Sequence, residues 1–134
     1  MRIVVTGAAG GIGSRLSKRL VGEGHDLFLI DDLSGGFAEN LGFLQELLFV
    51  GDLSELDLNK TLHGFHPQAI VHLAGKSSLA ECEENPIHAL RANFISTVAI
   101  AEYSRSVGAH LIFSSTSAVY EGLTEPLLDQ DLVT

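Results

Sequence analysis

The chain has 134 residues, of which 46% are hydrophobic and 19% are charged, so it is long enough to bury a core and lacks the composition of a disordered segment. Eight basic and seventeen acidic residues give a formal net charge of −9, which repels nucleic acid and anionic lipid. The apolar runs are far shorter than the ~20 residues that span a bilayer, and a single cysteine, Cys82, permits no internal disulfide. We therefore expect a cytoplasmic protein without a signal peptide, a membrane segment or a nucleic-acid partner.

Short apolar segments alternate with helical or polar segments along the chain. The apolar runs predict five strands, at residues 2–6, 26–31, 47–50, 69–73 and 110–114. The first predicted helix covers residues 11–23, where Leu16 and Leu20 lie one turn apart, and Gly24 suits the position after its end. Residues 32–40 are polar and contain glycine, so we expect a loop there.

The clearest helix is predicted after Asn85 and Pro86, because asparagine caps helices and proline fits their first turn. Its apolar residues recur every three or four positions, at Ile87, Leu90, Phe94, Val98 and Ala101. Gly108 ends the pattern. The sequence therefore predicts one continuous helix over residues 85–108.

The predicted strands are apolar throughout instead of alternating, which is typical of a parallel sheet that is covered on both faces. With right-handed crossovers, this pattern predicts a doubly wound α/β fold with five strands in the order 3-2-1-4-5. We expect one domain at residues 1–120. Residues 121–134 carry four acidic side chains and no basic one, and we expect them to form an acidic tail or loop.

Four glycines, Gly7, Gly10, Gly11 and Gly13, stand within seven positions between the first predicted strand and the first predicted helix. Gly7 permits a tight turn, Gly10 lets the backbone approach a pyrophosphate, and Gly13 lets the helix pack close to the strand. The N–H groups and dipole of the helix N-terminus then attract phosphate without a basic surface. The spacing alone also fits a plain tight turn.

Asp31 closes the second predicted strand, 18 residues after Gly13. This separation is close to that at which an acidic residue binds the adenosine ribose of a dinucleotide. A carboxylate there repels a 2′-phosphate, and no arginine or lysine lies between Arg19 and Lys60 to replace it. These features predict NAD as the cofactor, with NADP less favoured.

The spacing Thr6-Gly7-x-x-Gly10-x-x-Gly13 resembles that of the short-chain dehydrogenase/reductase superfamily. Further segments resemble its extended branch, in particular UDP-glucose 4-epimerases and nucleotide-sugar dehydratases: Gly51-Asp52-Leu53, the HLAG of residues 72–75, Asn93 with Thr97, and the FSSTSAVY of residues 113–120. The resemblance covers residues 2–126. It implies a Rossmann fold that binds NAD and a UDP-sugar, and hydride transfer through a 4-keto sugar.

The resemblance also implies roles for single residues. The glycine turn would face the pyrophosphate. Asp52 and Leu53 would contact the adenine, because they match the family's pair after the third strand. Ala74 and Gly75 would line the cofactor with their backbone after the fourth strand. Lys76 lies next to the position of a cofactor-contacting lysine in these epimerases.

Four more residues match family positions. Ile12 would lie beside the pyrophosphate, and Asn93 would lie close to cofactor and substrate. Ser114 would contact the cofactor at the end of the fifth strand. Thr116 matches the catalytic Ser/Thr, which hydrogen-bonds the substrate hydroxyl. Short hydroxyl residues at the end of a strand can also have a purely structural role.

In this family the chemistry also needs a Tyr-x-x-x-Lys pair, whose tyrosine takes a hydroxyl proton. Neither Tyr103 nor Tyr120 is followed by a lysine four positions later. We therefore expect the N-terminal part of an epimerase or dehydratase, truncated before the sixth strand and inactive alone. The alternatives are a non-catalytic NAD(H)-binding module and an NADP-linked reductase or regulator.

In this family the 85–108 helix packs beside the helix that carries the tyrosine, and the two form a dimer interface. Without its neighbour the helix would expose apolar surface, so we expect a homodimer or higher association, or marginal stability. His63 and His66 have the spacing of a metal pair but no evident third ligand, and we expect no metal site. His72 lies in an apolar run, which predicts a hydrogen-bonded core histidine.

Overall fold

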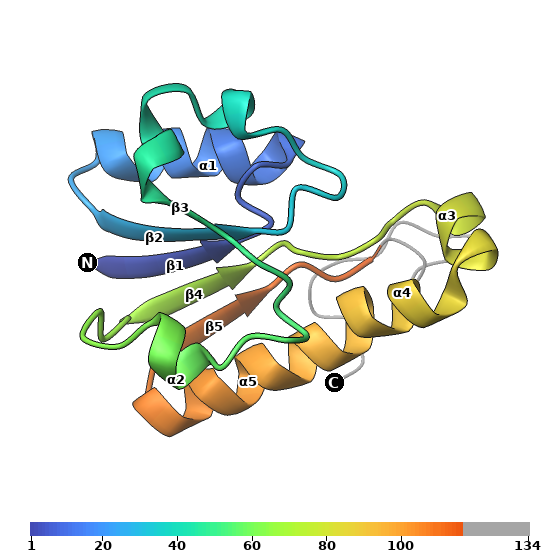
Figure 1. Ribbon diagram of the computed structural model, residues 1–134. Coiled ribbons are helices and arrows are strands. Elements are labelled where there is room, and N and C mark those ends of the chain that lie inside the picture. The colour runs from blue at the N-terminus through green and yellow to red at the C-terminus, as the bar shows by residue number, and fades with distance from the viewer. Residues whose placement is uncertain (117–134) are drawn as a thin grey trace, which may run out of the picture.

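The computed structural model describes residues 1–116 and contains one parallel five-stranded sheet (Figure 1). The strands are β1 (Arg2–Thr6), β2 (Asp26–Asp31), β3 (Leu48–Val50), β4 (Ala69–His72) and β5 (His110–Phe113). Their order is β3-β2-β1-β4-β5, which confirms the predicted doubly wound topology. The tail predicted at residues 121–134 lies outside the described residues.

Helices cover both faces of the sheet (Figure 1). One face packs against α1 (Gly11–Gly22) and the 3-10 segment η1 (Ala38–Leu47), and the other against α2 (Leu58–Thr61) and α5 (Ser96–Val107). The short helices α3 (Leu79–Glu84) and α4 (Pro86–Leu90) lie beyond the carboxyl ends of the strands. Within residues 1–116 no helix is long and apolar enough to cross a membrane.

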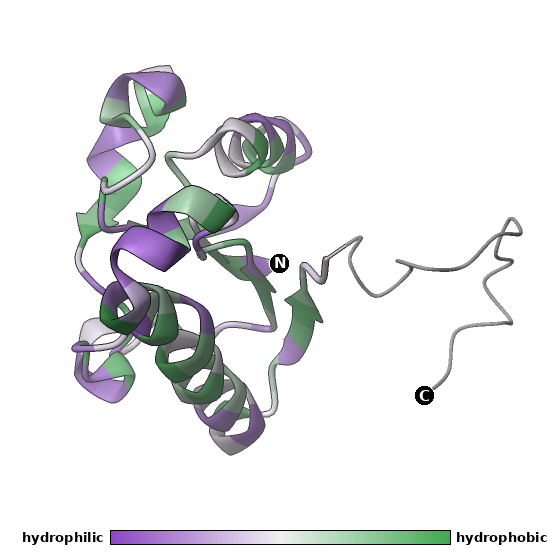
Figure 2. Ribbon diagram, turned by 90° about the vertical axis from the view of Figure 1, so that its right-hand side faces the viewer, coloured by the Kyte–Doolittle hydropathy of each residue, from purple (hydrophilic) through white to green (hydrophobic). Residues whose placement is uncertain are grey.

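The two covered faces explain why the strands are apolar throughout, and Figure 2 shows them mostly in the hydrophobic colour. Along β1, Ile3 and Val5 join the core beneath α1, whereas Val4 joins the core beneath α5. Because successive side chains of a strand point to opposite faces, both faces need apolar residues. The prediction of buried parallel strands is confirmed for β1, β2 and β4, whereas the edge strands β3 and β5 are largely exposed.

The predicted helix at residues 85–108 is helical from Pro86 to Val107, but it is not α-helical throughout. Asn85 caps α4 as predicted, but a π-helical turn, η2 (Arg91–Ile95), separates α4 from α5. The Ser96 hydroxyl shares its single hydrogen between the carbonyls of Arg91 and Ala92, at 2.8 and 2.9 Å, and so bonds to the widened turn. Gly108, with φ of +70°, ends α5 as predicted.

Two helical segments were not predicted. Part of η1 falls in the predicted loop at residues 32–40, and Gly42, with φ of +60°, kinks this segment, so no long helical period is present. The helix α3 has only six residues, and its cap is Ser78, which accepts from the amide of Glu81. Short elements of this kind carry too little periodicity to be recognised from sequence.

Candidate functional site

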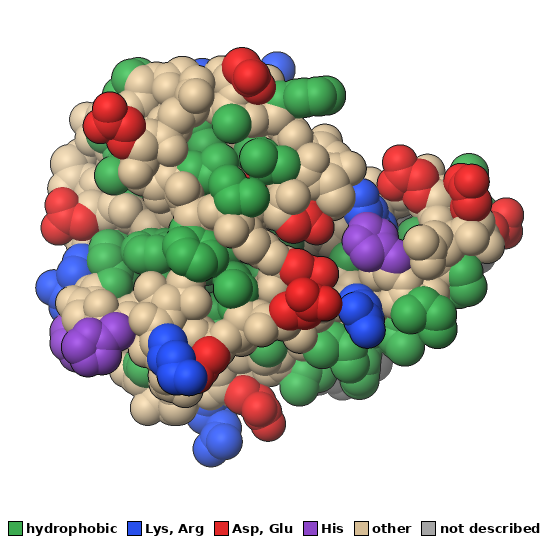
Figure 3. All heavy atoms as spheres, viewed as in Figure 1, with side chains coloured by type: hydrophobic (Ala, Val, Ile, Leu, Met, Phe, Trp, Pro, Cys, Tyr) green, Lys and Arg blue, Asp and Glu red, His purple; other side chains and the backbone are tan. Residues whose placement is uncertain are grey.

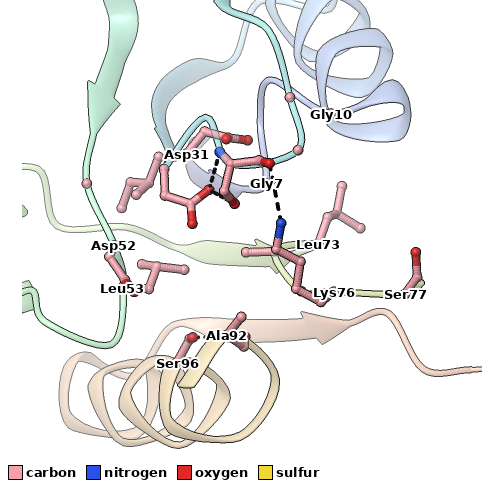
Figure 4. A pocket seen from close by; sticks show the side chains of 18 of the residues that line it. Gly7, Gly10, Asp31, Asp52, Leu53, Leu73, Lys76, Ser77, Ala92 and Ser96 are labelled. Carbon is pink, nitrogen blue, oxygen red and sulfur yellow. Dashed lines mark hydrogen bonds between the residues drawn. The ribbon is translucent and has the colours of Figure 1, made fainter. Parts of the chain in front are cut away.

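A cleft of about 320 Å³ lies at the carboxyl ends of the strands (Figure 4). The loops after β1, β2, β3 and β4 form its walls together with residues of the π turn and α5. Eight of the residues predicted to bind a cofactor line it: Gly7, Gly10, Asp31, Asp52, Leu53, Ala74, Gly75 and Lys76. Open α/β sheets bind ligands at this edge, where the strand order reverses between β1 and β4.

The glycine turn between β1 and α1 forms one end of the cleft. Gly7 has φ of +66°, and a Cβ there would lie 2.7 Å from the amide nitrogen of Ala74. A Cβ on Gly13 would lie within 3 Å of both Gly7 and Ala8, so only glycine lets α1 pack this closely. Gly10 precedes α1, and no side chain caps its first turn. The first amides of α1 are therefore suited to bind an anion.

Asp31 connects the end of β2 to the glycine turn. Its side chain is 7% exposed, and its two carboxylate oxygens accept hydrogen bonds from the amides of Ala9 and Leu33 at 2.9 and 2.8 Å. A carboxylate accepts about four hydrogen bonds, so acceptor capacity remains toward the cleft. The predicted ribose-binding residue thus also holds the turn in place, a role that the sequence spacing did not reveal.

Lys76 reaches across the cleft to the loop after β2 (Figure 4). Its Nζ lies 3.4 Å from the carbonyl oxygen of Ser34 and 3.9 Å from a carboxylate oxygen of Glu81. In the same loop, burial raises the pKa of Asp32, but hydrogen bonds from Ser34 and the charges of Lys76 and His88 outweigh it and hold that pKa below its usual value. The fold therefore places the ammonium group of Lys76 beside the loop after β2, which contains no lysine or arginine of its own.

Acidic residues outnumber this cation around the cleft. Within residues 1–116 the lining contains Asp31, Asp32, Asp52 and Glu81 but only one basic residue, Lys76. Figure 3 shows acidic side chains in the middle of the face of the molecule that it displays. A bound phosphate would therefore be held mainly by backbone amides.

Asn93 holds the backbone of the loop after β4. Its Oδ1 accepts from the amide of Lys76 at 2.6 Å, and its Nδ2 donates to the Lys76 carbonyl at 2.9 Å. A Cβ on Gly75 would lie 3.0 Å from the same Oδ1. Asn93 is not among the lining residues, although Ala92 and Ser96 on either side of it are. The side-chain amide of Asn93 therefore holds the loop that faces the cleft.

Five other predicted site residues are not among the lining residues: Gly11, Ile12, Gly13, Ser114 and Thr116. Ile12 is 69% exposed at the start of α1. Ser114 and Thr116 follow β5 and are exposed, and the amide of Ser114 donates to the carbonyl of His72 at 3.2 Å. Gly11 also lies outside the lining, and a Cβ there would meet no atom within 4 Å.

Sequence reasoning missed part of the lining. Many of the unpredicted residues come from the loop after β2 and from the segment around α3, among them Ser34, Gly35, Gly36, Ser77, Ser78 and Glu81. A Cβ on Gly36 would lie 2.7 Å from the carbonyl carbon of Ala9, so this glycine packs directly on the glycine turn between β1 and α1. The Gly35-Gly36 pair was the available signal. Within residues 1–116 no three His, Cys, Asp or Glu residues could together hold a metal ion.

A parallel sheet with a glycine turn before α1 and an acidic residue at the end of β2 defines a dinucleotide-binding Rossmann domain. Residues 3–134 match the NAD dependent epimerase/dehydratase family, and the chain belongs to this family.

Three similar proteins illustrate this membership. UDP-glucose 4-epimerase of Mycolicibacterium smegmatis is 39% identical over 121 residues, which cover 87% of this chain and 39% of that protein. The structure of Thermus thermophilus UDP-glucose 4-epimerase in complex with NAD superposes with a TM-score of 0.78 at 29% identity, and that of the Thermotoga maritima enzyme with UDP-glucose superposes with 0.80 at 31%. Both matches cover 87% of this chain and 38% of the other. The chain thus spans well under half of these relatives.

Proposed function

We propose that this chain binds NAD as the cofactor-binding part of a UDP-sugar 4-epimerase. The observation that carries the proposal is the meeting of the glycine turn and Asp31 in one cleft. The glycine turn and the start of α1 fit a diphosphate, because Gly7 and Gly13 have no room for a Cβ and no side chain caps the first turn of α1. The NAD complex of the Thermus thermophilus enzyme supports the choice of cofactor.

In this proposal each wall of the cleft binds one part of NAD. The backbone amides of Gly11 and Ile12 donate to the pyrophosphate, although neither residue is among those that line the cleft. The remaining acceptor sites of Asp31 bind the ribose hydroxyls, and Asp52 with Leu53 contacts the adenine. Asp31 would repel the 2′-phosphate of NADP.

Hydride exchange with carbon 4 of the sugar is the chemistry that NAD supplies in such an enzyme. From this chain, Thr116 would hydrogen-bond the sugar hydroxyl and Ser114 would contact the cofactor, as family resemblance implies. The 134 residues contain no Tyr-x-x-x-Lys pair to take the hydroxyl proton. We therefore expect NAD binding with negligible epimerisation by this chain alone.

Calorimetric titration with NAD and NADP, together with a UDP-galactose turnover assay, tests this function. NAD should bind more tightly than NADP, and turnover should be absent. Tighter binding of NADP would contradict the role of Asp31 and favour an NADP-linked reductase or regulator. Sustained turnover would contradict the argument from the absent pair.

The second candidate is a module that holds NAD(H) without catalysis, and the absence of Tyr-x-x-x-Lys favours it. A titration with UDP-glucose on the NAD-loaded protein distinguishes the two. The epimerase proposal predicts weak binding of the UDP-sugar through the residues after β5, whereas a pure NAD module predicts none.

We also propose that the chain forms a homo-oligomer through α4, η2 and α5. Large apolar side chains on these helices are exposed: Ile87, Leu90, Phe94, Ile95 and Val98. They recur at helical spacing, so they form a stripe that a second copy would bury. The proposal is tested by the charge substitution that is described in the Discussion.

A further inference from the structure

One buried imidazole joins the carboxyl ends of three strands next to the cleft. His72 ends β4 and is 1% exposed. Its Nδ1 lies 2.7 Å from Oγ1 of Thr6 at the end of β1, and its Nε2 lies 3.0 Å from Oγ1 of Thr97 on α5. Its ring stacks on Phe113 at the end of β5, with 6.0 Å between the ring centres. The side chain therefore contacts β1, β5 and α5.

The hydrogen-bond partners determine which ring nitrogen carries the proton. The Thr97 hydroxyl donates its only hydrogen to the carbonyl of Asn93 at 2.7 Å, so it must accept from Nε2–H of His72. Nδ1 is then an acceptor. The Thr6 hydroxyl donates to it and itself accepts from the amide of Ala74 at 3.3 Å. Every donor and acceptor in this chain of bonds is paired only when His72 is neutral.

The chain of bonds reaches both ends of the turn at residues 74–76, which lines the cleft. One arm runs from His72 through Thr6 to the amide of Ala74. The other runs through Thr97 to the carbonyl of Asn93, whose side chain holds the amide and the carbonyl of Lys76. His72 itself is not among the residues that line the cleft.

We propose that His72 is a positioning residue that fixes the turn at residues 74–76 in the conformation that receives NAD. This inference rests on the proposed function of the cleft. The imidazole acts through the hydroxyls of Thr6 and Thr97 and touches no bound group. Since a buried, fully paired polar network is rigid, it sets the position of backbone atoms that hydrophobic packing alone would leave free to shift.

The variant His72→Phe tests this role because it keeps a ring against Phe113 and removes both ring nitrogens. In the ligand-free protein, hydrogen exchange of the amides of Ala74 and Lys76 should become faster. The NAD dissociation constant should rise about tenfold, which is the effect of losing roughly one net hydrogen bond. The matched control is His110→Phe, the same change at an exposed histidine at the amino end of β5, and it should alter neither quantity.

A second variant, His72→Gln, separates the two arms. Its amide nitrogen takes the place of Nε2 and can still donate to Thr97, whereas no atom of glutamine takes the place of Nδ1 to accept from Thr6. Exchange at Ala74 should therefore accelerate while Lys76 stays protected. For the unmodified protein, ¹⁵N NMR of the imidazole should show a neutral ring protonated at Nε2. This spectrum decides the assignment even if His72→Phe does not fold.

Two results would overturn the proposal: unchanged NAD affinity in folded His72→Phe, or an imidazole of His72 that carries its proton on Nδ1 at neutral pH. Failure of the unmodified protein to bind NAD would instead overturn the proposed function of the cleft. The amide exchange and the NMR spectrum need no ligand, so they would still show whether His72 holds the turn.

Discussion

The two sides of the cleft differ in how deeply their strands are buried. On the β1–β2 side both strands are buried, and the glycine turn, Asp31 and the loop after β2 contact one another. On the β4–β5 side β4 is buried, but all residues of β5 are exposed or only partly buried, and the neighbouring helices expose an apolar stripe. In Figure 2 the strand at the sheet edge is largely hydrophobic in colour.

This difference shows that the side of the glycine turn is self-contained, in that its own close contacts hold it, whereas the helices of the other side present exposed apolar residues at helical spacing. Close backbone contacts of Gly13 with Gly7 and of Gly36 with Ala9 hold the first side together. The second side presents large side chains, such as Phe94 at 59% exposure, that gain free energy when they are buried. Four predictions test this contrast, and the first concerns the self-contained side.

Gly13→Ala should have the largest effect, because the new Cβ would lie about 2 Å from the carbonyl oxygen of Gly7. We expect the free energy of unfolding to fall by about 2–3 kcal/mol and NAD binding to be lost. Urea denaturation and calorimetry measure both quantities. Gly11→Ala is the control and should change stability little, since its Cβ meets no atom within 4 Å. Normal stability and binding in Gly13→Ala would show that the turn is not tightly packed.

Asp31→Ala should weaken NAD binding by roughly tenfold to a hundredfold, because the ribose contact and the bonds to the amides of Ala9 and Leu33 are lost together. The preference for NAD over NADP should also fall, as titration with both cofactors would show. Asp57→Ala is the matched control: this carboxylate also accepts from two amides, those of Asn59 and Lys60, but it caps α2 outside the cleft. It should cost stability and leave cofactor binding unchanged.

Phe94→Glu should weaken self-association by about tenfold or more, because a charge would have to be buried in the apolar stripe. Analytical ultracentrifugation over a range of concentrations measures the effect. Phe43→Glu is the control, since Phe43 is also exposed, at 74%, but lies on η1, on the opposite face of the sheet. Equal association of both variants, or a monomeric parent protein, would contradict an interface on these helices.

The smallest effect concerns pH. Burial lowers the pKa of His72 from its ordinary value of 6.5, and its neighbours Thr6, Thr97 and Phe113 carry no charge. Below pH 6.5 the unfolded chain therefore takes up the proton first. The stability that is present above pH 6.5 should decline as the pH falls toward the lowered pKa, by at most about 1.4 kcal/mol per pH unit. Urea denaturation at several pH values should show this component in the parent protein and not in His72→Phe.

Local features of the sequence were sufficient to predict the sheet and the turn. The ranges of β1 and β2 were predicted as observed, because buried parallel strands require uninterrupted apolar runs. Gly7 and Gly13 were assigned correctly as conformational requirements, since a positive φ and a close helix leave no alternative to glycine. The φ of Gly7 and the close approach of Gly13 to Gly7 and Ala8 depend on neighbours within a few residues.

The sequence by itself thus determined the strand order, the dinucleotide turn and the family. Only the tertiary structure decided that Lys76 reaches a loop 42 residues earlier, that Asn93 holds the backbone of Lys76, and that His72 pairs with Thr6 across 66 residues. The physical reason is that a side-chain hydrogen bond depends on positions in space to within a few tenths of an ångström. Residues that are far apart in the chain acquire such positions only when the sheet and its helices have packed.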